Sequence, residues 1–330
     1  MTNAYIRAIE YYLPEGIEYN DPQDYMTKKI GIYSKHIAAV DEYASDMACR
    51  ASEKLFESGI DRTEIDYLLY CTQSPDYYLP TTACLIQERL GLTTRCGALD
   101  FNLGCSGFVY GLSMAKGLVV SGQVNNVLLI TSETYSKFVN RRDRSVNLLF
   151  GDAAAAALIS KTETGESYIG SFIFGTDGRG GEKLIVQAGG LRNPASVETS
   201  VEIEDERGNF RSQNNLFMSG KEVYKFALRE VPKAIDELLH KENRTLADYD
   251  YFVFHQANLF MMDSLRQRLD IPEGKFSVQM EDCGNTVSAS IPIALKRDYL
   301  CGNIKKGDRI MLVGFGVGYS WSACSIVWNG

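Results

Sequence analysis

The chain has 330 residues, of which 34 are Lys or Arg and 42 are Asp or Glu, so the formal net charge is −8. Hydrophobic residues make up 45% and charged residues 23%, which are ordinary values for a globular protein. This composition excludes a disordered chain, a fibrous repeat and a disulfide-dense mini-domain. The length favours two domains or two tightly fused halves. The acidic balance argues against nucleic acid as the main partner, because phosphate binding needs an excess of Lys and Arg.

Targeting signals and metal-binding patterns are missing from the sequence. The most apolar stretch, residues 118–130, is interrupted by polar residues, and a membrane-spanning helix needs about 18 consecutive apolar residues. The N-terminus lacks a basic segment followed by an apolar core. We therefore expect a cytoplasmic protein with no membrane partner. The eight cysteines form no C-x-x-C pair and the three histidines lack ligand spacing, so we expect reduced thiols and no metal site.

Predicted helices and strands alternate along the chain, which is typical of an α/β protein. In chain order we expect a helix at 44–58, a strand at 65–71, a helix at 81–90, a strand at 98–103, a helix at 105–120, strands at 127–131 and 153–160, a helix at 220–240, a strand at 251–254, helices near 258–269 and 286–299, and strands at 309–314 and 321–328. The glycine-rich region 175–215 is either a long surface connection or a lid or entrance wall. No short-period repeat is present, so any duplication would be of half-chains.

Cys105 is the cysteine whose setting favours chemistry. It follows the predicted strand at 98–103 and begins the predicted helix at 105–120, which is almost entirely apolar and should be buried. The positive end of a helix dipole favours a thiolate. Gly104 and Gly107 allow a tight turn and close approach of a substrate. An average cysteine is more often a small core residue. Cys105 is a better candidate for a nucleophile than the other cysteines only because of its position.

His255 and Asn285 are polar residues that, like Cys105, lie at the end of a predicted strand or the start of a predicted helix. His255 leaves the carboxyl end of the predicted strand at 251–254, where open α/β sheets place ligands, although a satisfied core histidine is the commoner case. Asn285 precedes a predicted helix and taken alone is typical of a turn and helix cap. The glycine pattern at 314–319 is a weak dinucleotide fingerprint without room for a following crossover, so we exclude NAD binding.

Four motifs in chain order resemble the ketoacyl synthase III family, the initiating 3-oxoacyl-acyl-carrier-protein synthases. They are LGCSGF around Cys105, HQAN from His255, GNTVSAS around Asn285, and the terminal GFGVGYSW. Further matches are GIYSKHIA at 31–38, PTTACLIQ at 80–87 and FGDA at 150–153. One motif alone would be weak evidence. Together they span nearly the whole chain in the family's order and at its usual length.

The resemblance implies an α/β protein with a thiolase-like fold and, normally, a homodimer. Two similar halves, 1–165 and 166–330, would form a five-layer αβαβα sandwich. The first half would supply the nucleophile Cys105 and the second half His255 and Asn285. A thiolate exchanges readily with thioesters, and neutral His and Asn side chains offer N–H groups to an enolate formed by loss of CO₂. The backbone N–H groups of Cys105 and of the residue matching the family's glycine, Val317, would form the acyl oxyanion hole.

The implied activity is that of a 3-oxoacyl-acyl-carrier-protein synthase III-like acyltransferase. An acyl-CoA would acylate the cysteine, and a malonyl thioester on acyl carrier protein would then lose CO₂ and attack the acyl-enzyme. This reaction initiates fatty-acid or related biosynthesis. Coenzyme A is thus implied as part of a substrate, and no cofactor is expected.

The implied binding residues depart from the family's pattern in several places. The CoA positions are Tyr25 and Lys29, where the family often has Trp and Arg, together with Arg144, Lys221 and Asn258. Phe260 stands where an Arg commonly helps to bind carrier protein. The positive charge for that partner would then come from Lys225, Arg266 and Arg268.

Leu79 matches an acyl-pocket position that members often fill with Phe from the partner subunit. A smaller residue there predicts room for a longer or branched acyl chain.

Three other functions compete with condensation. In a specialised pathway, the cysteine would pass its acyl group to an oxygen or nitrogen nucleophile without release of CO₂. A papain-like protease has the same Cys, His, Asn order, but this chain lacks that family's Cys-x-x-Cys-Trp setting. A non-enzymatic binding protein on the same fold is disfavoured because all three chemical residues are present. The acyl chain, the carrier of the extender and the pathway stay open.

Overall fold

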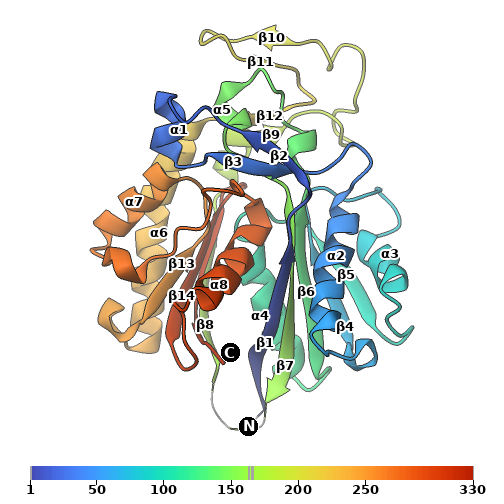
Figure 1. Ribbon diagram of the computed structural model, residues 1–330, viewed down its shortest axis with the longest axis vertical. Helices are drawn as coiled ribbons and strands as arrows, with labels where there is room; N and C mark the ends of the chain where they lie inside the picture. Colours follow the sequence, from blue (N-terminus) through green and yellow to red (C-terminus); the bar gives the residue numbers. More distant parts are fainter. Residues whose placement is uncertain (1, 163, 165–166, 330) are drawn as a thin grey trace.

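The structure, a computed structural model, describes residues 2–162, 164 and 167–329. Two sheets stand side by side (Figure 1). The first has the order β1-β7-β6-β4-β5, with strands β1 (Asn3–Tyr12), β4 (Tyr67–Cys71), β5 (Gly97–Phe101), β6 (Asn126–Glu133) and β7 (Ala153–Thr162). The second has the order β13-β14-β15-β8, with strands β8 (Ile169–Thr176), β13 (Tyr251–Phe254), β14 (Arg309–Gly316) and β15 (Ser320–Val327).

The two sheets repeat one topology. In the first, β4 and β6 run parallel, and β7 and β1 continue the sheet by antiparallel pairing. In the second, β13 and β14 run parallel, and β15 and β8 continue it in the same way. A parallel bridge between Phe252 and Phe276 takes the place that β5 occupies beside β4. The chain is thus built from two related halves. The expected boundary between residues 165 and 166 lies outside the described residues.

Helices complete five layers, as Figure 1 shows. The outer face of the first sheet is covered by α2 (Ala44–Glu57) and α3 (Thr82–Arg89), and that of the second by α6 (Gly220–Glu242) and α7 (Leu259–Arg268). The middle layer holds α4 (Gly107–Val120) and α8 (Ser290–Leu300), which contact both sheets. A helix between two sheets has little exposed surface, which explains the apolar sequence of α4. The expected five-layer αβαβα sandwich is confirmed.

The predicted elements are confirmed with shifted ends. The helix expected from residue 105 begins at Gly107, because residues 102–106 form a turn. The helix expected from residue 286 begins as a 3-10 turn, Val287–Ala289, before α8. Sequence periodicity missed β1 and β8, whose burial patterns are irregular. It also missed the small elements β2 (Gly16–Tyr19), β3 (Ser34–Ile37), α1 (Tyr25–Ile30) and α5 (Arg144–Asn147).

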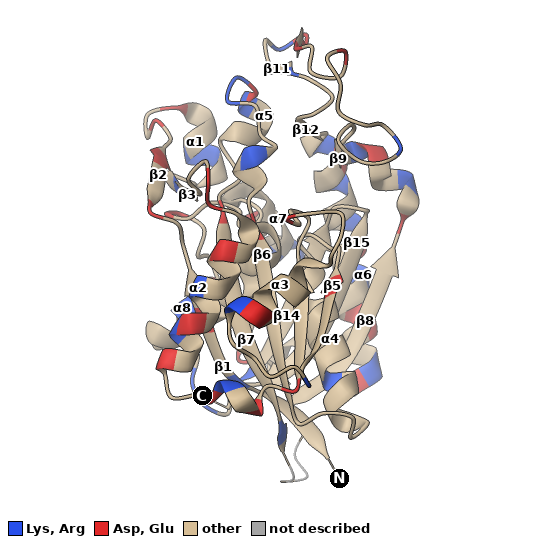
Figure 2. Ribbon diagram, turned by 90° about the vertical axis from the view of Figure 1, so that its right-hand side faces the viewer, with Lys and Arg blue, Asp and Glu red and all other residues tan. Residues whose placement is uncertain are grey.

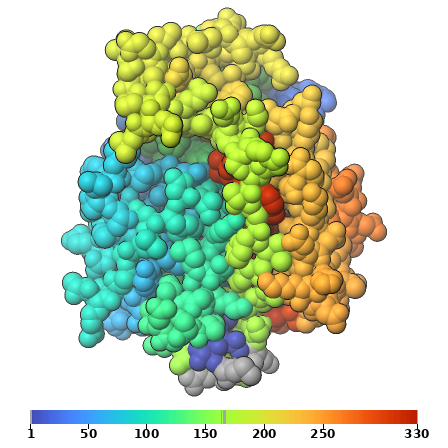
Figure 3. Space-filling model, turned by 180° about the vertical axis from the view of Figure 1, so that it is seen from behind, coloured from blue at the N-terminus to red at the C-terminus, as the bar shows by residue number. Residues whose placement is uncertain are grey.

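The region expected to be irregular forms a projection above the two halves (Figures 1 and 3). It contains two small pairings, β9 (Leu184–Val186) with β12 (Leu216–Met218) and β10 (Ile203–Glu204) with β11 (Phe210–Arg211). Arg211 fastens the second hairpin to the body, because its guanidinium bonds the buried Asp143 carboxylate at 2.6 Å. The backbone N–H of Arg144 donates to Asn209 Oδ1 at 3.1 Å. The projection is therefore attached to the start of α5.

Three further observations concern the described part of the chain. No helix there is both long and apolar enough to cross a membrane. No group of His, Cys, Asp and Glu side chains within these residues is arranged to hold a metal ion. All eight cysteines are free thiols.

The central layer gives a prediction for stability. Leu112 of α4 is fully buried between the sheets, so Leu112→Ala should lower the free energy of unfolding by about 2–5 kcal/mol through the cavity it leaves. Val120, at the end of the same helix, is 41% exposed, and Val120→Ala should change it by less than about 0.5 kcal/mol. Urea unfolding at one protein concentration measures both. Equal effects would contradict the burial of α4.

Candidate active site

The three residues singled out from the sequence line one pocket. Cys105 comes from the turn before α4, His255 from the end of β13, and Asn285 from the turn before α8. The pocket encloses about 70 Å³, the volume of roughly two water molecules. Its apolar walls are Tyr135, Leu149, Phe150, Leu184, Met218, Val223, Met261 and Phe315. Because β9 and β12 supply two of these walls, the projection is an entrance wall of the pocket as well as a surface connection.

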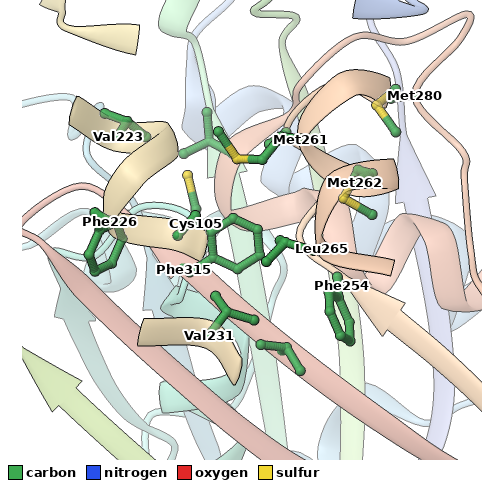
Figure 4. Packing of buried hydrophobic residues seen from close by; sticks show 14 of the residues in the cluster. Cys105, Val223, Phe226, Val231, Phe254, Met261, Met262, Leu265, Met280 and Phe315 are labelled. Atoms are coloured by element: carbon green, nitrogen blue, oxygen red, sulfur yellow. The ribbon is translucent and has the colours of Figure 1, made fainter. Parts of the chain in front are cut away.

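Cys105 lies two residues before α4 begins, in a turn closed by a hydrogen bond from Gly107 N to Gly104 O at 2.8 Å. Its buried side chain packs against Gly316 of β14, where a Cβ atom would lie 2.8 Å from the Sγ atom. Only glycine permits this approach of a strand from the second half. The backbone N–H groups of Val317 and of Cys105 itself lower the pKa of the thiol. In Figure 4 the Cys105 side chain lies beside Phe315 and below Met261.

Burial opposes the thiolate that the helix dipole is expected to favour at Cys105. Burial raises the pKa of this thiol to about 12, and the neighbouring Glu133 carboxyl acts in the same direction, whereas the two backbone N–H groups lower it. Desolvation is thus the largest influence on this pKa. The thiol is neutral at physiological pH, so its proton must leave as the sulfur attacks.

His255 is buried at the end of β13 and is held on both sides. Its backbone N–H donates to Val313 O at 2.8 Å, and its Nδ1 atom lies 2.8 Å from Ser290 Oγ. The Ser290 hydroxyl also reaches Val287 O at 2.9 Å; when it donates to Nδ1 instead, the ring carries its proton on Nε2. Burial lowers the pKa of His255 to about 3. The ring is neutral at physiological pH, as the sequence-based argument requires.

Asn285 is held by backbone pairing with the first half. Its N–H donates to Leu149 O at 2.9 Å and its carbonyl accepts from Gly151 N at 3.1 Å. The side-chain Oδ1 accepts from Val287 N at 2.9 Å, which leaves the amide N–H₂ on the side of His255, with Nδ2 3.5 Å from the ring Nε2. Two side-chain N–H donors, from the amide and the imidazole, can therefore face one substrate atom.

Backbone strain accompanies this arrangement. Val287 has φ of 52°, in the left-handed region that β-branched residues rarely adopt. Such a residue costs of order 1–3 kcal/mol and persists only where its surroundings enforce it. Here the Asn285 side chain and the 3-10 turn at Val287–Ala289 enforce it.

Of the five residues expected to contact CoA, Asn258 is the one that lines the pocket. Tyr25 on α1 is 73% exposed. The Lys29 ammonium lies 4.2 Å from the centre of the Phe260 ring. Arg144 pairs with Asp24 at 3.0 Å. Asn258 lines the pocket and caps α7, and the fifth, Lys221, is an exposed residue in the first turn of α6.

The expected carrier-protein residues lie on α6 and α7, two helices that contact each other. Lys225 on α6 is exposed and pairs with Glu222 at 2.9 Å. Arg268 is exposed at the end of α7. The side chain of Arg266 is only 18% exposed and bonds Asp263 and the carbonyl of Ile271. It is therefore engaged in holding the end of α7.

Leu79 does not line this chain's pocket. It is 85% exposed, on the segment that follows β4. As an acyl-pocket residue it would have to act on another copy of the chain.

Sequence reasoning missed the residues that support the catalytic candidates. Ser290 and Phe315 belong to recognised motifs but were given no role; Ser290 contacts the His255 ring, and Phe315 meets it edge-on at 5.6 Å. Tyr135 and Glu133, at the end of β6, carry no motif at all. The available signal was that β6 is a buried strand whose carboxyl end carries the polar residues Thr131, Ser132 and Glu133.

Comparison with known proteins gives consistent results over the whole chain. Residues 99–178 match the family described as 3-oxoacyl-[acyl-carrier-protein (ACP)] synthase III, and residues 239–328 match its C-terminal family. The beta-ketoacyl-[acyl-carrier-protein] synthase III of Caldanaerobacter subterraneus subsp. tengcongensis is 39% identical, over 96% of each chain.

Two solved structures are also similar. A crystal structure of 3-oxoacyl-(acyl-carrier-protein) synthase III has 48% identity and a TM-score of 0.97, covering 99% of this chain and 100% of that one. The priming beta-ketosynthase of the R1128 polyketide pathway has 31% identity and a TM-score of 0.86, covering 99% and 96%.

The neutral state of His255 predicts a pH dependence of stability. The folded-state pKa of about 3 lies below the ordinary 6.5 of an exposed histidine, so the unfolded chain binds more protons between these values. The stability that the neutral His255 ring contributes is fully present above pH 6.5 and is lost as the pH falls toward 3. Between about pH 7.5 and about pH 5, the wild type should lose about 2 kcal/mol more than His255→Asn. Urea unfolding at both pH values tests this, and equal losses would refute it.

Proposed function

The chain belongs to the 3-oxoacyl-[acyl-carrier-protein] synthase III family, and we propose that its pocket carries out the decarboxylative condensation of an acyl group from acyl-CoA with a malonyl thioester. The protein is accordingly an acyltransferase-type enzyme that initiates fatty-acid or related synthesis. The observation that carries the proposal is one pocket lined by a cysteine from the first half and by His255 and Asn285 from the second.

In the first step, the Cys105 sulfur attacks the thioester carbonyl of acyl-CoA. The C–S bond to CoA breaks, and the thiol proton leaves with the CoA sulfur, which gives acyl-Cys105 and free CoA. The backbone N–H groups of Val317 and Cys105, which lower the pKa of the thiol, are suited to the carbonyl oxygen as it becomes negative. Val317 retains this donor although the family usually has Gly there.

In the second step, the malonyl thioester loses CO₂ and becomes an enolate. His255 and Asn285 present N–H donors from two sides, and neither is charged, so both favour the negative oxygen without a strong ion pair. The enolate carbon then attacks the acyl carbonyl, the C–S bond to Cys105 breaks, and the thiolate takes a proton from solvent. The product is a 3-oxoacyl thioester.

Intact-protein mass spectrometry tests the proposal. The wild type, incubated with acyl-CoA donors from acetyl to octanoyl, should gain the acyl mass, and Cys105→Ala should not. Addition of malonyl-acyl carrier protein should then give CO₂ and a 3-oxoacyl product. Asn285→Ala should still be acylated but should release CO₂ about 100- to 1,000-fold more slowly. No acyl gain with any donor would overturn the proposal, and transfer without CO₂ would favour simple acyl transfer.

The same panel tests the acyl chain and the carrier. We propose that Leu79 leaves room for chains longer than acetyl, so strict acetyl preference would refute that proposal. Comparison of malonyl-acyl carrier protein with malonyl-CoA identifies the extender's carrier. Figure 2 shows Lys and Arg interspersed with Asp and Glu, so a carrier protein would meet local positive charge, from Lys225 and Arg268, rather than a uniformly basic face.

Three of the residues expected to contact CoA support it as the acyl donor's carrier. Tyr25, Lys29 and Arg144 put an exposed ring and two cations on α1 and α5, which the ion pair between Arg144 and Asp24 joins. Aromatic and cationic groups suit the adenine and phosphates of CoA. On this proposal CoA is a substrate carrier, and the enzyme works without a resident cofactor.

We also propose a homodimer. The strand β5 forms the edge of the first sheet, and unpaired strand edges invite a second chain. Beside it Tyr77, Tyr78 and Leu79 are exposed, and the Tyr78 hydroxyl bonds Gly189 O, which joins them to the exposed Leu191. Exposed apolar patches of this kind mark interfaces. A second copy seated there would bring its Leu79 toward the neighbouring pocket.

Sedimentation equilibrium tests the dimer. The wild type should have twice the chain mass of 36.8 kDa, and Leu79→Lys should shift the mass toward a single chain, because a buried unpaired ammonium opposes association. Leu300→Lys, at a 65% exposed site at the end of α8, is the matched control and should leave the dimer intact. A wild-type mass of one chain would refute the proposal.

A further inference from the structure

Glu133 is a buried acid that the reaction above does not use. It ends β6 and is fully buried. Its Oε1 atom accepts from Ser288 Oγ at 2.9 Å, and its Oε2 atom accepts from Gln73 N at 3.0 Å and Ser74 Oγ at 3.3 Å. Within the described residues, no Lys or Arg forms an ion pair with it. Burial of a carboxyl group without a neighbouring cation costs free energy. A role for Glu133 in the site would account for this cost.

One oxygen of this carboxyl holds the loop of the second half that begins with Asn285. Ser288 lies in the 3-10 turn that follows Asn285 and contains the strained Val287. At the other end of the same turn, Ser290 contacts the His255 ring. The bond from Ser288 to Glu133 therefore anchors the segment that connects the two N–H donors of the pocket.

The other oxygen holds the loop of the first half that backs the cysteine. Gln73, whose N–H it accepts, uses its side chain to bond Asn102 at 3.0 Å and the hydroxyl of Tyr135 at 2.5 Å. A Cβ atom at Gly104 would lie 2.6 Å from Gln73 Oε1, so the amide packs directly on the turn that presents Cys105. The carboxyl thus stands between the cysteine turn and the Asn285 loop.

The charge of the carboxyl also matters to the sulfur. Burial raises the pKa of Glu133 to about 8, so the group is largely neutral at physiological pH. The titratable groups that act with it are Asp152, Cys71, Cys105, Tyr70 and Tyr135. A neutral carboxyl does not oppose thiolate formation at Cys105, whereas an ionised one does.

We propose that Glu133 is a positioning residue for the condensation step: it fastens the Asn285 loop of one half to the cysteine turn of the other and so fixes the donors that stabilise the enolate. The inference rests on the proposed function. It assigns to Glu133 and Ser288 an effect on decarboxylation that exceeds their effect on acylation, because Ser288 belongs to the loop of Asn285 and not to the turn of Cys105.

The test measures the two half-reactions separately in the full-length enzyme. Ser288→Ala removes one donor to the carboxyl, and it should slow CO₂ release from malonyl-acyl carrier protein about 10-fold or more, because small misplacements of oriented groups cost that much. The rate of Cys105 acylation should stay within about 2-fold, and the fall should be in kcat rather than in KM. Glu133→Ala should lower CO₂ release at least as far, and Glu133→Gln, which keeps an acceptor of the same size, should restore most of it.

A second readout and a matched control separate positioning from general stability. The rate of Cys105 alkylation by iodoacetamide should flatten above about pH 8 in the wild type as Glu133 ionises, and it should keep rising in Glu133→Gln. Asp298 is an equally buried carboxylate, bonded to Tyr251, Ser277 and Gln279 away from the pocket. Asp298→Asn should change both half-reactions equally or leave both unchanged.

The outcomes distinguish this inference from the function on which it rests. If the wild type neither acylates Cys105 nor releases CO₂, the proposed function fails. If the wild type does both but Ser288→Ala and Glu133→Ala lower the two half-reactions by the same factor, the positioning inference is overturned. If Glu133→Ala does not fold, the rates of the two half-reactions in Ser288→Ala and Glu133→Gln test the positioning inference in the same way.

Discussion

Backbone pairing between the two halves is the constraint on which the pocket depends. Asn285 of the second half adds to the segment at 149–151 of the first as a short parallel bridge. The approach is close enough that a side chain at Gly151 or Gly284 would collide with the opposite backbone. Because hydrogen bonds fix direction as well as distance, this pairing determines which way the Asn285 side chain faces. The catalytic candidates therefore form a set only when both halves are folded together.

The duplicated topology explains why the site lies where it does. The turn before α4 carries Cys105, and the corresponding turn before α8 follows Asn285, so the two central helices begin at the same end of the molecule. Strand β14 of the second half passes directly beside the cysteine, at Gly316. A nucleophile and its oxyanion donors are thus supplied by opposite halves without any long active-site loop. Figure 4 shows the apolar side chains of α6 and α7 that close the space around them.

Burial then decides the protonation states. It raises the pKa of the Cys105 thiol and lowers that of His255, so both groups are neutral in the resting site, as removal from water requires. Neutrality suits a reaction in which negative charge appears first on one thioester oxygen and then on another, because no resident ion competes for the donors. Desolvation of the buried sulfur acts against the dipole of α4, on which the sequence-based prediction relied.

The sequence by itself determined the α/β class, most central strands and helices, and the residues Cys105, His255 and Asn285, because hydrophobic periodicity and short motifs are local. The five layers and the activity followed from the resemblance of those motifs to a family. Tertiary structure alone decided the raised pKa of Cys105 and the network of Glu133, since each depends on groups far apart in the chain. It also showed that Leu79 is exposed and that Arg266 is engaged in holding α7. Burial and long-range hydrogen bonding depend on residues that are distant in the chain, so no local sequence pattern predicts them.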